Sequence, residues 1–209
     1  MKQIKEYIAE AFINKGNVGK IGNTRKIQYT EHPTTKEELV SIIDKRIAKE
    51  GKKCDLNDID VSKITDMSWL FDGSPFNGDI SMWDVSNVEN MAYMFENSKF
   101  NGDISEWVVS NVKTMKFMFE SSKFDGNISQ WIVSSVEEMR GMFKNAKFSG
   151  DISEWDVRNV KDMSFMFDGA KKFNCNLSKW KPNKLVTFGD MFYGSGIQQN
   201  PPKWYIDKQ

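Results

Sequence analysis

Apolar and polar residues recur along this chain with a period of 24 residues. Each unit reads Ile-x-x-Trp-x-Val, then Val-x-x-Met-x-x-Met-Phe, with a further Phe five residues later. The clearest copies span residues 80–100, 104–124, 128–148 and 152–173, and the last of these contains one extra residue. Self-similarity at a fixed period of this length is the signature of a repeat architecture, in which each unit is buried by its neighbours.

The Ile-x-x-Trp-x-Val segment places apolar residues at i, i+3 and i+5, which is the spacing of a leucine-rich-repeat strand. We therefore predict one strand per coil, with the strands stacked in parallel. The Met and Phe residues that follow have near-helical spacing and predict a short turn or helix on the opposite, convex side. The seven predicted strands cover residues 56–61, 80–85, 104–109, 128–133, 152–157, 177–182 and 201–206.

The first 53 residues do not follow the repeat. Ile4, Ile8 and Phe12 have the i, i+4, i+8 spacing of an amphipathic helix over residues 1–14. Thr35-x-x-Glu38 is a capping-box pattern and predicts a second helix that runs to about Lys49, where Gly51 ends it. A repeat array needs a terminal element over its first coil, and this segment suits that role.

The predicted fold class is thus an α/β solenoid. It is a leucine-rich-repeat-like, right-handed repeat array with a parallel sheet on one face and an α-helical N-terminal cap. The domain boundaries are 1–53 for the cap and 54–209 for about six 24-residue coils plus a terminal strand. Pro201 and Pro202 suit an edge strand, because they cannot donate to a further strand.

Charge and hydropathy argue against nucleic acids and membranes as partners. The chain has 29 basic and 29 acidic residues and no basic stripe, so we expect no nucleic-acid binding. No window has the roughly 18 apolar residues of a membrane helix, so we expect no membrane insertion. Glu6 and Glu10 interrupt any apolar signal segment. The chain as given is therefore expected to be cytoplasmic, or a mature form whose leader has been removed, and its compartment stays open.

Two columns of the repeat have alternative interpretations. The tryptophans at the fourth position of each segment could fill the core or stack sugars in a ladder. The Asp and Asn residues before each predicted strand could cap turns through their side chains or bind calcium, which prefers oxygen ligands. We favour core filling for the first column and turn capping for the second. The members of these columns are Trp83, Trp107, Trp131, Trp155, Trp180 and Trp204, and Asp79, Asp103, Asn127, Asp151 and Asn176.

The sequence contains few of the residues that usually carry out catalytic or redox chemistry. His32 is the only histidine, and Cys54 and Cys175 lie five coils apart, so we expect free thiols rather than a disulfide. No cofactor, metal site or catalytic residue is predicted, and we expect the protein not to be an enzyme.

The variable positions within the predicted strands are more informative, because they should line the concave sheet. Val108 and Ile132 are apolar where their neighbours are polar or charged, and such residues mark interaction surfaces. A lower-ranked candidate is a convex aromatic column of Trp69, Tyr93 and Phe117 that resumes at Phe165. The predicted binding residues are Met82, Asp84, Glu106, Val108, Gln130, Ile132, Glu154, Asp156, Arg158 and Lys179.

The repeat Phe-Asn-x-Asp-Ile-Ser-x-Trp-Asp-Val-Ser-Asn-Val-x-x-Met-x-x-Met-Phe resembles the BspA-like leucine-rich-repeat family, also called DUF285, over about residues 54–206. The resemblance implies a leucine-rich-repeat-like array with a binding role and no catalytic residue. Members of this family are often found at the bacterial cell surface or secreted.

Together these features predict a monomeric, non-enzymatic protein–protein interaction module that recognises its partner through the concave face. The partner itself is not identified by the sequence. The alternative is a carbohydrate-binding or glycan-binding surface protein.

Overall fold

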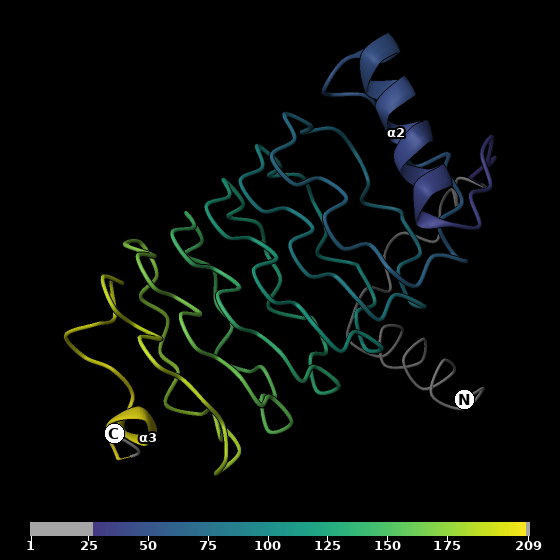
Figure 1. The fold of residues 1–209 in the computed structure, drawn as a ribbon. Helices are drawn as coiled ribbons and strands as arrows, with labels where there is room; N and C mark the ends of the chain where they lie inside the picture. The colour runs from purple at the N-terminus through teal and green to yellow at the C-terminus, as the bar shows by residue number, and fades with distance from the viewer. Residues whose placement is uncertain (1–26, 208–209) are drawn as a thin grey trace, which may run out of the picture.

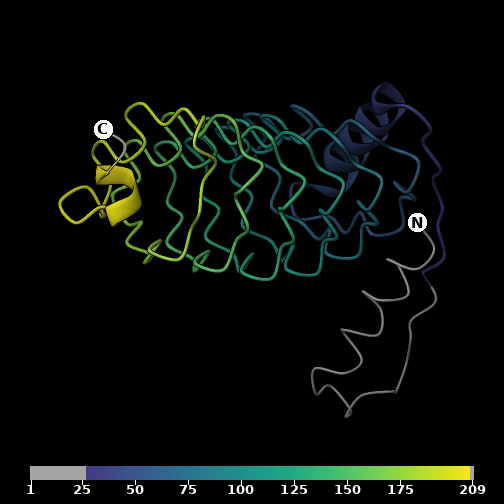
Figure 2. The same cartoon turned by 90° about the horizontal axis from the view of Figure 1, so that it is seen from below.

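The computed structural model describes residues 27–207. Over this range the chain winds through a row of stacked coils, with helix α2 (Lys36–Glu50) at one end and the short helix α3 (Lys203–Ile206) at the other (Figures 1 and 2). A single cluster of buried side chains runs through the stack from Leu39 to Tyr205. The amphipathic helix predicted for residues 1–14 lies outside the described residues.

The helix predicted after Thr35 is confirmed. The Thr35 hydroxyl accepts a hydrogen bond from the Glu38 N–H at 3.2 Å, and the Glu38 carboxylate accepts one from the Thr35 N–H at 3.3 Å. These reciprocal bonds satisfy two backbone donors that the helix itself leaves unpaired. Gly51 ends the helix at φ 88°. Leu39 and Ile43 are buried against the first coil, so α2 is fixed to the stack by its apolar side.

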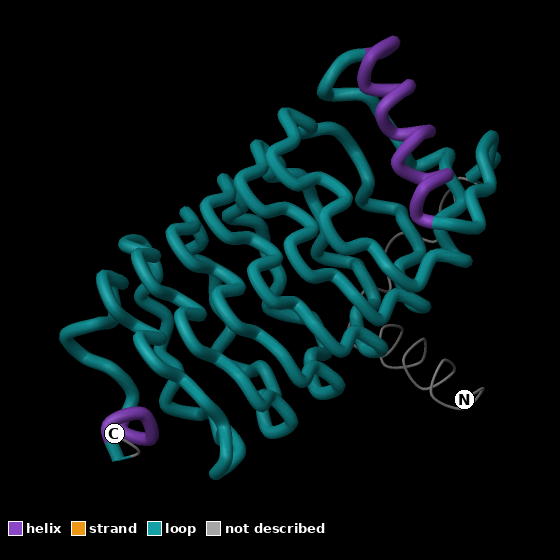
Figure 3. The backbone as a smooth tube through the Cα atoms, viewed as in Figure 1, coloured by secondary structure: helices purple, strands orange, loops and turns teal. Residues whose placement is uncertain are grey.

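The predicted fold class is wrong. An α/β solenoid with a parallel sheet on one face and an α-helical N-terminal cap requires strands, and residues 27–207 contain only seven isolated parallel bridges and no strand (Figure 3). The predicted strands at 56–61 and at the equivalent positions of later coils are turns. The predicted terminal strand at 201–206 ends in the helix α3.

Turns replace the strands because polar side chains bond to their own backbone. In the second coil, Trp83 N–H donates to the Ile80 carbonyl at 3.2 Å and Val88 N–H donates to the Val85 carbonyl at 3.0 Å. Asp79 Oδ1 accepts from the N–H two residues later, at 2.9 Å. Asp and Asn compete with extended structure in this way. The i, i+3, i+5 apolar spacing therefore marks two consecutive turns here.

The hydrogen bonds that join the coils lie instead on the Met–Phe segment. Met91, Tyr93 and Phe95 donate their N–H groups to carbonyls of the next coil at 2.9–3.0 Å, and Asn97 does so at 2.8 Å. The same pattern repeats along the stack and gives four columns of five hydrogen bonds each. We call this set of columns the backbone ladder. Its segments are residues 66–73 in the first coil and the equivalent residues of each later coil, ending at 187–194.

Alternating backbone conformations explain why all hydrogen bonds of the ladder point in the same direction along the stack. Tyr93 and Asn97 have positive φ angles of 60° and 53°, and the equivalent residues of the other coils do too. As a result, the four ladder carbonyls of a coil accept from the preceding coil, while the four ladder N–H groups donate to the following one. Each column is therefore a chain of peptide dipoles aligned head to tail, as in an α-helix.

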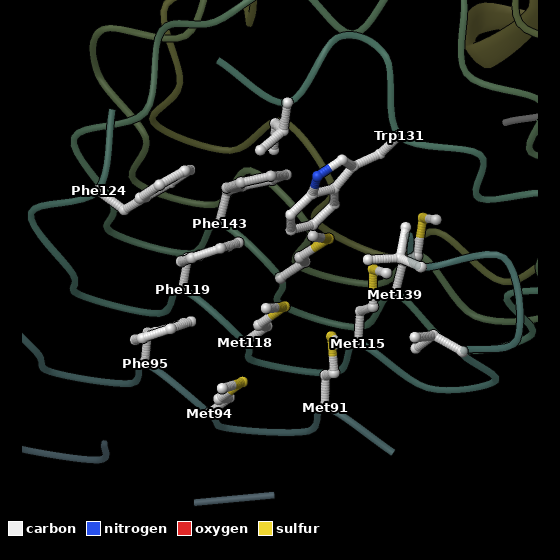
Figure 4. Close-up of a cluster of buried hydrophobic side chains, with 14 of the residues drawn as sticks. Met91, Met94, Phe95, Met115, Met118, Phe119, Phe124, Trp131, Met139 and Phe143 are labelled. Carbon is white, nitrogen blue, oxygen red and sulfur yellow. The ribbon is translucent and has the colours of Figure 1, made fainter. Parts of the chain in front are cut away.

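The interior is filled by columns of identical side chains. Phe119 lies between Phe95 and Phe143, with ring centroids 5.6 and 5.7 Å away, and the methionines lie beside these rings (Figure 4). All three rings are 0 % exposed. The two cysteines are free, as predicted, and Cys54 is buried. Neighbouring coils thus bury each other's side chains, which a single coil could not do.

Candidate functional site

The predicted binding residues lie on the turns that connect the core columns and on the short links between those turns. Nine of the ten are exposed and Asp156 is half-buried. Because no sheet forms there, the concave-sheet description does not apply, and we call the surface made by these ten residues the turn face. The turns hold these side chains outward, because the residues between them, such as Trp107 and Val109, are buried in the core.

The centre of the turn face is a shallow apolar depression. Val108 and Ile132 are 37 % and 48 % exposed, and Glu106 and Gln130 line the depression beside them. Its volume is about 60 Å³, far below the several hundred Å³ of a usual small-molecule pocket. Met82, which is 47 % exposed, lies one coil earlier, at the position equivalent to Glu106. Three consecutive coils therefore each expose one large apolar side chain on this face.

Charges on the turn face are paired at one end only. Lys179 forms an ion pair with Glu154, which raises the pKa of Lys179. Arg158 Nε donates to Asp156 Oδ1 at 2.8 Å, and this hydrogen bond lowers the pKa of that carboxyl. Asp84 and Glu106, in contrast, form no ion pair with any residue in 27–207. The apolar centre is thus bordered by uncompensated negative charge on its earlier coils.

From Trp83 to Trp180 the tryptophan column belongs to the core, as predicted, and the sugar-ladder alternative is wrong for these residues, whereas Trp204 is half-buried. Trp83, Trp107 and Trp131 are 3–4 % exposed, and the rings of Trp83 and Trp107 stack with centroids 6.5 Å apart. Each indole N–H donates to a backbone carbonyl of the preceding coil, for example Trp131 Nε1 to the Ile104 carbonyl at 3.1 Å. This bond satisfies the polar end of a buried ring. From Trp83 to Trp180 the column has no exposed ring face on which a sugar could stack.

The Asp and Asn column caps turns, as predicted. Asp103, Asn127 and Asp151 each accept a backbone N–H two residues later at 2.9–3.0 Å. Among residues 27–207, no group of three or more His, Cys, Asp or Glu side chains is placed to hold a metal ion. His32 lies at the first end of the stack, with Nδ1 3.3 Å from an Asp60 carboxylate oxygen.

The aromatic column that was predicted on the convex side forms a partly exposed stack, and we call it the aromatic column. Trp69, which is 50 % exposed, stacks on Tyr93 with centroids 3.8 Å apart, and Tyr93 is 5.1 Å from Phe117. The Arg140 guanidinium lies 4.8 Å from the centroid of Phe165. Sequence reasoning missed that all four aromatic residues have positive φ angles. Gly141 in the same column was a usable signal, because glycine favours that conformation.

Sequence reasoning also missed Glu96, which lies on the ladder near other carboxylates. Its Oε2 atom is buried without a hydrogen-bond partner in the described part of the chain. Burial raises the pKa of Glu96, the nearby Glu120 and Asp72 raise it further, and Lys144 lowers it. Lys144 is itself paired with Glu120 at 3.0 Å. The ionised form of Glu96 is therefore disfavoured in the folded chain.

Replacement of Glu96 by glutamine should stabilise the fold at neutral pH. A carboxyl whose folded pKa is raised adds stability below its unfolded pKa, and this is lost as pH rises through the folded value. The gain at pH 7 should be no more than about 1 kcal/mol, because the side chain is partly solvated. Thermal unfolding between pH 4 and pH 8 measures it. The benefit should shrink toward pH 4, and Glu89→Gln, at an exposed carboxylate, should show neither effect. A benefit that does not change with pH would contradict the prediction.

Comparison with known proteins identifies a family but no characterised relative. A family model described as "Mycoplasma protein of unknown function, DUF285" matches residues 45–149 and again residues 121–208. No curated protein and no solved structure matches the chain. Neither helix within residues 27–207 has the length and apolar character needed to cross a bilayer.

Proposed function

The chain belongs to the DUF285 family of mycoplasma proteins of unknown function, and from that membership and the turn face we propose that it is a non-enzymatic module that binds another protein. The observation that carries this proposal is the row of exposed apolar side chains, Met82, Val108 and Ile132, on three consecutive coils. Exposed apolar residues ringed by polar ones mark interaction surfaces.

The shape of the turn face favours a protein over a small molecule. The depression between Val108 and Ile132 holds about 60 Å³, which accommodates a single side chain but not a metabolite. The surrounding turns are held by buried tryptophans on both sides, such as Trp107 and Trp131. A surface fixed in this way loses little conformational entropy when a partner binds.

The charges indicate what the partner should present. Asp84 and Glu106, beside Val108 and Ile132, have no ion-pair partner in the described part of the chain. A complementary surface would insert an apolar side chain between Val108 and Ile132 and place Lys or Arg opposite these carboxylates. Apolar anchors supply most of the affinity at such interfaces, and complementary charge supplies specificity and association rate.

The double variant Val108→Glu plus Ile132→Glu should lose partner binding. Two carboxylates in the depression would add like charge beside Glu106 and remove the apolar anchor site, so affinity should fall at least tenfold, or about 1.4 kcal/mol. Quantitative affinity purification from the source cells, followed by calorimetry with the purified partner, measures the change.

A matched control for this variant is Lys123→Glu plus Lys147→Glu, which places two new carboxylates on exposed residues outside the turn face. These substitutions should leave recovery of the partner unchanged. Circular dichroism verifies that both double variants retain the fold. Recovery of the same partner by the Val108→Glu plus Ile132→Glu variant would reject the turn face as the binding surface.

Glycan binding remains the alternative, and the structure changes how it would work. The buried tryptophan column cannot supply an aromatic ladder, because its rings are 2–4 % exposed from Trp83 to Trp180. Aromatic stacking would have to use the aromatic column, where Trp69 is half-exposed. A glycan array with the wild-type chain tests this alternative directly.

A further inference from the structure

At both ends of the backbone ladder, most of the ladder groups have no backbone partner within residues 27–207. In every later coil the ladder carbonyls accept hydrogen bonds from the preceding coil, but the equivalent carbonyls of Asp66, Ser68, Leu70 and Asp72 accept none within residues 27–207. At the last coil, the ladder N–H groups of Phe188, Asp190 and Phe192 likewise donate to no group in the described range. We call these two edges the carbonyl strip and the amide strip.

The two strips are complementary in chemistry and in register. Each column of the ladder begins at a carbonyl of the first coil and ends at an N–H of the last one, so Asp66 and Phe188 terminate the same column. Three free donors spaced two residues apart thus correspond to three free acceptors with the same spacing. Aligned peptide dipoles make the carbonyl end negative and the N–H end positive, as at the ends of a helix. Unpaired edges of this kind are templates for pairing with another chain.

In the described part of the chain, a few side chains pair with one backbone group of the strips or lie near them. At the amide strip, the fourth ladder N–H, that of Gly194, donates to Gln198 Oε1 at 2.8 Å. At the carbonyl strip, Lys36 Nζ donates to the Ser68 hydroxyl at 2.7 Å and lies 3.8 Å from Asp66 Oδ1. The ammonium group lies near the negative end of the columns without hydrogen-bonding to their carbonyls. The remaining ladder donors and acceptors at the two strips have no hydrogen-bond partner within residues 27–207.

Both strips are flanked by exposed apolar side chains. Trp69, 50 % exposed, lies within the carbonyl strip, and Tyr193, 66 % exposed, lies beside the amide strip. Leu185, just before the amide strip, is 87 % exposed. Helix α2 packs on the core at one end, and at the other the α3 residue Tyr205 packs on Phe192 at 4.8 Å. The helices cover the core at the ends, including the ring of Phe192, which is 2 % exposed, while Trp69 and Tyr193 stay open to solvent.

We propose that the chain associates end to end with a second copy, the amide strip of one molecule pairing with the carbonyl strip of the next. The contact continues the ladder that joins the coils within one molecule, and it buries Trp69 against the segment that contains Tyr193. It is heterologous, so each copy retains one free end and longer assemblies can grow. This conclusion differs from the monomer predicted from the sequence and is independent of the turn face.

A complementation experiment tests the proposal. Trp69→Asp blocks the carbonyl strip, and Tyr193→Asp blocks the amide strip. Aspartate tolerates the positive φ of Trp69, 63°, better than most residues do, so the first variant should fold. Sedimentation velocity should show wild-type mass rising past the dimer as concentration increases. Each variant alone should remain monomeric, with its dissociation constant raised at least tenfold, and an equimolar mixture should form dimers and nothing larger.

Two results of this experiment would overturn end-to-end association. A wild-type chain that stays monomeric at several hundred micromolar, or a mixture that stays monomeric while both variants are folded, overturns the proposal. Leu185→Asp provides a second amide-strip variant should Tyr193→Asp misfold. The Val108→Glu plus Ile132→Glu variant should associate as the wild type does, which separates this contact from partner binding at the turn face.

Discussion

Replacement of Phe119 by alanine should lower the free energy of unfolding by about 3–5 kcal/mol. The side chain is 0 % exposed and stacks between Phe95 and Phe143, with Phe124 4.4 Å away on its own coil. A cavity in the middle of the stack removes contacts on both neighbouring coils, because each coil is stabilised by the two it touches. Urea unfolding followed by circular dichroism measures the change.

Tyr193→Ala is a suitable control for that measurement. It also removes an aromatic ring from the ladder segment of a coil, but the side chain is 66 % exposed, so the cost should stay within about 0.5 kcal/mol. Both variants should be measured at a concentration low enough to keep the chain monomeric. If Phe119→Ala cost less than about 1.5 kcal/mol, the stack would have collapsed around the missing ring, and the side-chain columns would not be the main source of stability.

The sequence was sufficient to identify the repeat, the buried columns and helix α2. A tryptophan that recurs every 24 residues has to meet its own equivalents, and Trp83 and Trp107 do stack, with centroids 6.5 Å apart. The boundaries of α2 followed from local chemistry, because a capping box and a terminal glycine act within a few residues. These predictions rest on burial and on local hydrogen bonds, both of which the residue pattern encodes directly.

The sheet was predicted wrongly because burial does not determine backbone direction. Ile80, Trp83 and Val85 would be buried in either a strand or two turns, and Asp79 and Asp84 decide for turns by bonding to the backbone two residues later. The ladder was missed for a related reason. It requires positive φ at aromatic positions such as Tyr93, which contradicts their usual preference and is maintained by stacking and inter-coil hydrogen bonds.

The candidate site was predictable only in part. Exposure of Val108 and Ile132 follows from their position between core residues, and the structure brings them together with Glu106 and Gln130 in one depression. The curvature assigned to this face did not follow, because it depended on the sheet. The open ends of the ladder could not be predicted either, since they are a property of the backbone hydrogen-bond direction and not of any side-chain pattern.

Replacement of Gly141 by alanine adds only a methyl group, but it should lower the free energy of unfolding by about 2–5 kcal/mol. A methyl group built there would lie 2.2 Å from Phe117 Cε1, which over-packs the aromatic column at a cost of about 1–3 kcal/mol. The residue also has a φ of 59°, and left-handed backbone costs a non-glycine residue about 1–2 kcal/mol. Urea unfolding gives the sum of the two effects.

Two further substitutions separate the cost of the clash with Phe117 from the cost of the left-handed backbone. Gly73 has a φ of 60° and nothing within 4 Å of a built Cβ, so Gly73→Ala should cost the backbone contribution alone. In a Phe117→Ala background the clash at position 141 disappears, and Gly141→Ala should there cost about as much as Gly73→Ala. The difference between the two backgrounds is the coupling energy of the pair. An equal cost in both backgrounds would mean that Phe117 does not hold its place over Gly141. The aromatic column would then be a loose surface feature that does not constrain the ladder beneath it.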